Sequence, residues 1–258
     1  MSVPVNPPGF VVRTEAQKAA SDNGYRHERG IERGWLHYAS TTASGSIWIG
    51  GASEHGPWLL SLDHSGVAAE IGSLPASPVP GPGIATFVFA NLAELHVALG
   101  RIYNLAVSLP EAPLERFKAE TANLPRTTEA ERMVIQRIGQ DVFRDALMKY
   151  WGGRCPLTGI AEPGLLRASH IVPWADCSDA QRLDVHNGLL LSALWDAAFD
   201  RGLISFAHDG TVLTNPQLSE TARKALGIAT APALTGLRAE HRANLALHRA
   251  LNGFHIGG

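Results

Sequence analysis

The stretch RCPLTGIAEPGLLRASHIVPWADCSDAQRLDVHNGLLLSALWDAAFDRGLISF, residues 154–206, carries most of the information in this chain. His170 ends an apolar, strand-like run, and the Asn-Gly pair that begins at Asn187 predicts a turn. The helix-like segment that follows carries Asp196 and Asp200, and residues four apart lie on one face of a helix. A strand end, a turn and a helix could therefore bring an imidazole, an amide and two carboxylates together.

These residue types suit the hydrolysis of a phosphodiester bond. A neutral histidine can take a proton from water, and carboxylate oxygens are ligands for a hard cation such as Mg²⁺. The cation would stabilise the negative charge that develops on the phosphate and on the leaving oxygen.

The same stretch resembles the HNH endonuclease family, a ββα-metal nuclease fold, and in particular its restriction-type subgroup. Within the stretch the resemblance is carried by four segments: Cys155-Pro-Leu-Thr-Gly159, Ala168-Ser-His-Ile-Val-Pro-Trp174, Arg182-Leu-Asp-Val-His-Asn-Gly-Leu-Leu-Leu191 and Phe199-Asp-Arg-Gly202. Two segments before it, Arg137-Ile-Gly-Gln140 and Phe143-Arg144, resemble the helix that is commonly attached to this subgroup. Together they form a specific pattern over roughly residues 127–251, about half of the chain.

By position, the resemblance implies that His170 is the general base and that Asn187 braces the loop and orients His170. Asp196 stands where the last motif residue of the family contributes to the metal, so the motif reads H-N-D. Ser169 stands where many relatives carry an acidic ligand. We expect Mg²⁺ or Mn²⁺ to be held by Asp196, Asp200 and Ser169, with phosphate and water completing the shell.

Each of these residues also has a purely structural interpretation. His170 could be a buried histidine at a strand end, Asp196 an exposed helix residue, and Asp200 a partner of a neighbouring arginine or amide. Trp174 and Trp195 are expected in the core. Four arginines near the stretch are candidate DNA-phosphate contacts, with a solvated surface position as the alternative for each: Arg154, Arg167, Arg182 and Arg201.

The chain has only two cysteines, Cys155 and Cys177, and no CxxC pair. We therefore expect no structural zinc. The small module is expected to be stabilised instead by packing against helices at residues 128–150 and 235–251.

Composition and charge limit the partners. The 258 residues include 22 basic and 24 acidic side chains, a net charge of −2, which excludes a globally cationic DNA-coating protein. Residues 1–125 carry 8 basic and 11 acidic side chains, and the rest carry 14 and 13. No apolar run is long enough to span a membrane, so we expect a cytoplasmic protein without a membrane partner.

We predict an α+β protein with a C-terminal ββα-metal HNH module and flanking helices, preceded by a small β-rich or α+β domain. The predicted boundaries are residues 1–110 for the first domain, 111–126 for a linker and 127–258 for the HNH domain. Short aromatic runs around Trp35, Trp48 and Trp58 predict strands in the first domain. That domain matches no motif, and it could serve specificity or protein interaction.

The resulting prediction is a metal-dependent DNA endonuclease of restriction or defence, whose cleavage could depend on DNA modification. Double-strand cleavage would imply a homodimer by analogy, because HNH modules nick one strand. Two alternatives stay open. One is a non-catalytic DNA- or protein-binding module on a decayed HNH scaffold, and the other is a toxin-like nuclease acting on DNA or RNA.

Overall fold

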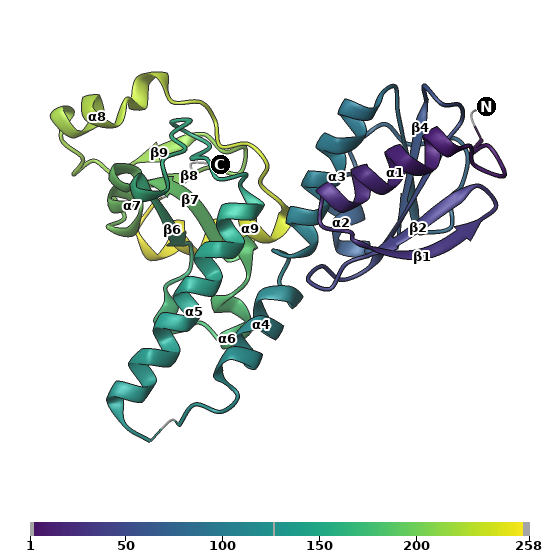
Figure 1. The fold of residues 1–258 in the computed structure, drawn as a ribbon. Coiled ribbons are helices and arrows are strands. Elements are labelled where there is room, and N and C mark those ends of the chain that lie inside the picture. Colours follow the sequence, from purple (N-terminus) through teal and green to yellow (C-terminus); the bar gives the residue numbers. More distant parts are fainter. Residues whose placement is uncertain (1–2, 126, 255–258) are drawn as a thin grey trace. The chain divides into compact units, whose positions relative to one another are not determined.

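A computed structural model describes residues 3–125 and 127–254 of the chain (Figure 1). The chain divides into two compact units, Met1–Ala112 and Pro113–Gly258. Both contain helices and antiparallel strands, so the predicted α+β class is confirmed. None of the helices in the described ranges has an apolar stretch long enough to cross a membrane.

The first unit is an antiparallel sheet covered by helices. Its strands pair in chain order, β1-β2-β3-β4-β5. Its elements are α1 (Phe10–Asp22), β1 (His27–Glu32), β2 (Trp35–Ala39), β3 (Ser46–Gly51), β4 (Trp58–Leu62), α2 (Ser65–Glu70), β5 (Ala85–Phe89) and α3 (Leu92–Ala106). Trp35 and Trp58 are buried in its core, whereas Trp48 is half-buried and stacks on His37 with ring centroids 4.5 Å apart.

The second unit is built around a two-stranded sheet and the helix that follows it. Its elements are α4 (Glu111–Thr121, which begins just before the unit boundary), α5 (Glu129–Tyr150), β6 (Leu166–His170), α6 (Asp179–Arg182), β7 (Gly188–Ser192), α7 (Ala193–Asp200), β8 (Ile204–Phe206), β9 (Val212–Thr214), α8 (Glu220–Leu226) and α9 (Ala239–Leu251). Strands β6 and β7 pair antiparallel, with His170 opposite Gly188, and α7 follows directly. This succession is the ββα arrangement that the sequence predicts.

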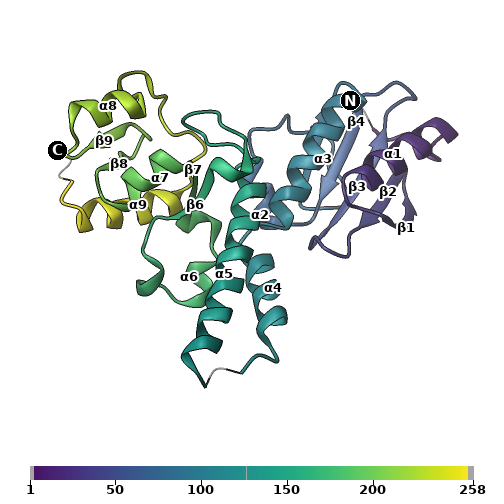
Figure 2. The same ribbon diagram turned by 60° about the vertical axis from the view of Figure 1, so that its left-hand side comes forward.

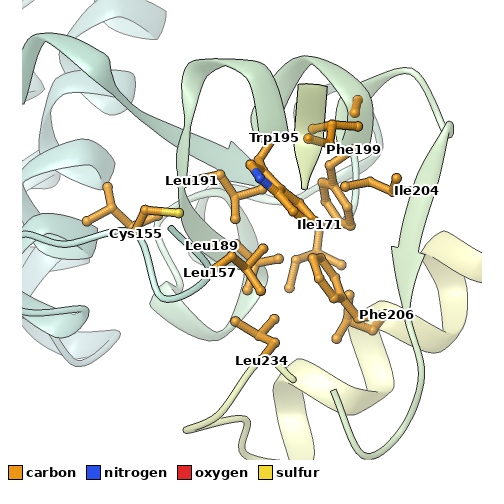
Figure 3. Packing of buried hydrophobic residues seen from close by; sticks show 14 of the residues in the cluster. Cys155, Leu157, Ile171, Leu189, Leu191, Trp195, Phe199, Ile204, Phe206 and Leu234 are labelled. Atoms are coloured by element: carbon orange, nitrogen blue, oxygen red, sulfur yellow. The ribbon is translucent and has the colours of Figure 1, made fainter. Parts of the chain in front are cut away.

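Two helices cover opposite faces of the β6–β7 sheet. A Cβ atom at Gly188 would lie 2.5 Å from Phe143 of α5, so α5 packs tightly on one face. On the other face, Trp195 and Phe199 of α7 pack into a cluster with Leu189, and Figure 3 shows how these side chains meet those of Ile204 and Phe206 from β8. The cluster is apolar, and it extends to Leu245 of α9.

Helix α5 begins at a capping box. The Thr128 hydroxyl accepts from the Glu131 amide, and the Glu131 carboxylate accepts from the Thr128 amide. The apolar side chains of α5 are buried only in its second half, where Phe143 and Leu147 meet the sheet. Val134 in the first half is 52% exposed, because that part of the helix extends past the sheet.

The segment 111–126, which the prolines predicted to be a linker, contains the helix α4. Its Phe117 is buried, and Arg116 forms ion pairs with Glu120 of the same helix and with Asp145 of α5. Figure 2 shows α4 and α6 beside α5. Proline at position 113 lies in the first turn of α4, where its missing N–H costs no helical hydrogen bond.

Candidate active site

His170 lies at the end of β6 on the face covered by α5. Its ring stacks on Phe143, with centroids 3.9 Å apart, and packs perpendicular to the Trp174 ring, with centroids 5.3 Å apart. Its Nε2 atom lies 2.9 Å from the carbonyl oxygen of Arg182. A carbonyl can only accept, so this nitrogen carries the proton.

The other ring nitrogen of a neutral His170 then holds a lone pair. Burial lowers the pKa of His170, and the nearby Arg182 charge lowers it further, although the hydrogen bond to the Arg182 carbonyl acts in the opposite direction. The imidazole is therefore neutral at pH 7. A neutral imidazole whose N–H is already used can accept a proton from water at its second nitrogen.

Asn187 is buried, and it ties together the loop that faces His170. Its side-chain oxygen accepts from the Val172 amide at 2.9 Å, and its Nδ2 donates to the Gln181 carbonyl at 3.1 Å. Gln181 immediately precedes Arg182, whose carbonyl holds the His170 ring. The Asn187 amide thus fixes both ends of the loop between β6 and α6.

Ser169 and Asp196 form a second group on the other face of β6. The Ser169 hydroxyl donates a hydrogen bond to the Asp196 carboxylate. Burial raises the pKa of Asp196, and the charge of Asp200 also raises it, while the Ser169 hydroxyl and the charge of Arg167 lower it. Two carboxylates and a hydroxyl therefore gather here beside one arginine.

The predicted site residues fall into these two groups because alternate side chains of a strand point to opposite faces. His170 faces α5 with Asn187 and Arg182, whereas Ser169 faces α7 with Asp196 and Asp200. Among residues 3–125 and 127–254, no hydrogen bond, ion pair or ring contact joins His170 to Asp196. The two groups are separated by a single step of the chain, from Ser169 to His170.

Oxygen atoms dominate the second group, and this donor set fits a hard cation such as Mg²⁺ or Mn²⁺. Asp196 is half-buried, and burial disfavours its charged form. A neighbouring positive charge would therefore stabilise its carboxylate. Within the described part of the chain, no cluster of three or more His, Cys, Asp or Glu side chains is arranged to hold a metal by itself. A cation here would therefore depend on Asp196, Asp200 and Ser169 together with water or substrate oxygen. Cys155 and Cys177 are buried free thiols.

The four candidate arginines differ in what their guanidinium groups contact. Arg154 donates to the Gly159 carbonyl, and Arg167 donates to the Gly164 and Leu166 carbonyls at 3.0 Å. Arg182 donates to the Trp174 carbonyl at 2.9 Å and pairs with Asp179 at 3.0 Å. Arg201 is exposed, and its side chain makes no hydrogen bond or ion pair to the residues that the structure describes.

Two aromatic residues next to His170 were not identified as site residues from the sequence. The sequence places Phe143 in a segment that carries the family resemblance but assigns it no role, and it predicts that Trp174 lies in the core. Trp195 is indeed buried, but Trp174 is only half-buried, and the Arg182 guanidinium lies over its ring at 5.1 Å. The useful signal was the pair Gly188 and Phe143, because a glycine in a strand often marks the close approach of another side chain.

Comparison with protein families gives one match within the second unit. Residues 155–207 match the model of a family described as HNH endonuclease. The matched range contains β6, β7 and α7, together with both groups of side chains described above. A comparison with curated proteins found no match.

Proposed function

We propose that this chain, whose residues 155–207 match a family described as HNH endonuclease, is a metal-dependent DNA endonuclease that hydrolyses phosphodiester bonds. The observation that carries the proposal is the setting of His170. Its ring is neutral, is oriented by the Arg182 carbonyl and keeps one nitrogen available as an acceptor.

In the proposed reaction, His170 accepts a proton from the attacking water as the water oxygen bonds to phosphorus. Phe143 and Trp174 restrict the rotation of the imidazole, so its acceptor nitrogen keeps one direction. Asn187 acts as a positioning residue, because it holds the loop whose Arg182 carbonyl orients the ring.

Asp196, Asp200 and Ser169 are the proposed ligands of the divalent cation. When bound, the cation would supply positive charge to stabilise the phosphate and the leaving oxygen. The raised pKa of Asp196 supports this assignment, because a buried carboxylate beside a second acid is stabilised by a cation. Arg201 is the proposed contact to a DNA phosphate, since its guanidinium is exposed.

The resemblance to restriction-type nucleases supports a role in restriction or defence. In that setting the first unit would supply specificity, and DNA modification is one feature that it could detect. Residues 1–125 carry a net charge of −3, from 8 basic and 11 acidic side chains, which argues against strong non-specific DNA binding by that part.

One observation favours a second candidate function, a DNA-binding module without catalysis. His170 and Asp196 lie on opposite faces of β6, and the described residues include no complete metal-binding cluster. An HNH scaffold that has lost catalysis would keep its core packing and its arginines. It would not need to keep a general base and metal ligands on the same side of the strand.

A plasmid-nicking assay separates the two candidates. Supercoiled DNA is incubated with the protein in Mg²⁺, in Mn²⁺ or in EDTA, and the same assay is run with His170→Ala and with His208→Ala, an exposed control histidine. We expect nicking that needs the cation, falls about 10²- to 10⁴-fold in His170→Ala and survives in His208→Ala. Nicking that persists in EDTA or in His170→Ala would contradict the mechanism, and DNA binding without nicking would favour the second candidate.

A further inference from the structure

A pocket lies between α4, the first half of α5 and the segment from Trp174 to Arg182 that contains α6. Its volume is about 430 Å³, which is within the range of about 300–1,000 Å³ typical of small-ligand sites. It is lined by Phe117, Arg132, Ile135, Gln136, Trp174, Asp179 and Arg182. All seven residues belong to the second unit.

Gly139, in the middle of α5, leaves space for the Trp174 ring. Glycine in a helix interior is destabilising compared with alanine. A Cβ atom on Gly139 would lie 2.8 Å from Cη2 of Trp174 and 3.4 Å from Cε2 of Phe117. Gly139 therefore allows both aromatic rings of the pocket to approach the helix.

Arg182 joins this pocket to the candidate general base. Its guanidinium lies over the Trp174 ring at 5.1 Å and is held by the Trp174 carbonyl and by Asp179. Its own carbonyl holds the His170 ring, and the Trp174 ring packs perpendicular to that ring. A group bound in the pocket would thus contact Trp174 and Arg182, the two residues that hold the candidate general base.

The pocket combines apolar and polar walls in the way that a nucleobase requires. Aromatic rings and planar guanidinium groups both stack on nucleobases. Trp174 supplies an aromatic ring of this pocket, and Arg182 supplies the guanidinium group. Gln136 is an exposed amide that can hydrogen-bond to a base edge. Arg132 and Arg182 against Asp179 leave one excess positive charge, which suits the adjoining phosphate.

We propose that this pocket receives one unstacked nucleobase of the DNA substrate, beside the phosphate that is cleaved. The proposal rests on the nuclease function proposed above, and it adds that the enzyme takes a base out of the stack to align the strand.

Binding experiments in EDTA test the pocket without any cleavage. Three short fluorescent duplexes are compared by anisotropy: a fully paired duplex, the same duplex with one unpaired dA, and the same bulge with an abasic nucleotide. The two bulged duplexes have the same phosphates and differ only in the base. We expect the unpaired dA to be bound on the order of tenfold more tightly than the abasic bulge. Equal affinity for those two duplexes in the wild-type protein overturns the proposal.

Matched variants test whether the base is bound in this pocket. Gln136→Ala and Trp174→Ala should lose the preference for the base, and Trp174→Phe should keep most of it. Gln140→Ala changes another exposed glutamine of α5 that does not line the pocket, and it should bind like the wild type. Thermal melting checks that each variant is folded. If Trp174→Ala does not fold, the result for Gln136→Ala alone decides whether the base is bound in this pocket. A preference that survives in folded Gln136→Ala places the base elsewhere and overturns the proposal.

The two proposals can fail separately. If plasmid nicking is not observed, the nuclease function fails, while the comparison of dA with an abasic nucleotide still tests the pocket. If nicking is observed but the base makes no difference to binding, only the pocket proposal fails.

Discussion

At the scale of single residues, the proposed chemistry depends on His170 and Ser169, which are neighbours in sequence with different surroundings. His170 is buried against Phe143, and Ser169 hydrogen-bonds to Asp196 on the other face of the strand. Burial acts on both titratable groups, lowering the pKa of the histidine and raising that of the carboxyl. In each case burial favours the uncharged form.

The pH dependence of nicking should reflect His170. A general base must be neutral, so the rate falls as the pH drops through its pKa, and burial holds that pKa below 6.5. We expect an acid limb that lies at lower pH than the pKa of an ordinary histidine would give, measured at two cation concentrations. If the pH at which the rate falls changes with the cation concentration, the titrating group is a metal ligand. If that pH does not change, the titrating group is His170.

Phe143→Leu provides the check on this assignment. It removes the ring stacked on His170 and admits water, so the fixed limb should move to higher pH. Phe199→Leu removes the matching stack on His248 and should leave the limb unchanged. A limb that does not respond to Phe143→Leu contradicts burial as its cause.

Asp196→Asn should separate activity from stability. The folded state raises the pKa of Asp196, so its charge opposes folding at pH values above that pKa, and neutral asparagine removes this cost. We expect a melting temperature at pH 7 that is equal to or above that of the wild type, together with loss of cation-dependent nicking. Asp209→Asn, at an exposed turn, is the activity control. Full activity in Asp196→Asn would exclude this carboxylate as a metal ligand.

At the scale of elements, the ββα module is held between α5 and α7. Helix α5 reaches the sheet closely only because position 188 has no side chain. The capping box of Thr128 and Glu131 defines where α5 begins, since capping depends on residues that are close in sequence. Helix α4 forms within the range predicted as a linker, because proline is accepted in the first turn of a helix.

Gly188→Ala should therefore weaken the module. The added Cβ would lie 2.5 Å from Phe143 and 2.8 Å from Leu147, and overpacking of this kind costs typically about 1–3 kcal/mol. A loss of that size lowers the melting temperature by roughly 2–12 °C in a protein of this length. Gly164→Ala, which has no atom within 4 Å of its new Cβ, is the control for circular-dichroism melting. Equal melting temperatures for both variants would show that α5 can move away.

At the scale of the whole molecule, every predicted site residue lies in the second unit, Pro113–Gly258. That unit also contains its own apolar cluster, which extends from Cys155 to Leu245. The near-neutral charge of −2 agrees with a nuclease that does not coat DNA, because only the surface around the site needs to be cationic.

A fragment of residues 111–258, which keeps α4 whole, should fold and nick DNA without the first unit. Its core and all proposed catalytic groups are internal to it. We expect a cooperative thermal transition and cation-dependent nicking, measured beside the full chain on modified and unmodified plasmids. Loss of selectivity in the fragment would assign specificity to the first unit. A fragment that melts without cooperativity would contradict the independence of the second unit.

The amino-acid sequence alone predicts the α+β class, the ββα order of elements and the resemblance of residues 155–207 to HNH endonucleases. It could do so because strand alternation, turn residues and helix caps are local properties. Only the tertiary structure decided that His170 is held by the Arg182 carbonyl and stacked on Phe143, while Ser169 turns towards Asp196. The contact of Phe143 with His170 and the contact of Ser169 with Asp196 each join residues 27 positions apart. The physical reason is that the face a strand residue occupies, and the pKa it acquires there, depend on which distant helix packs against it.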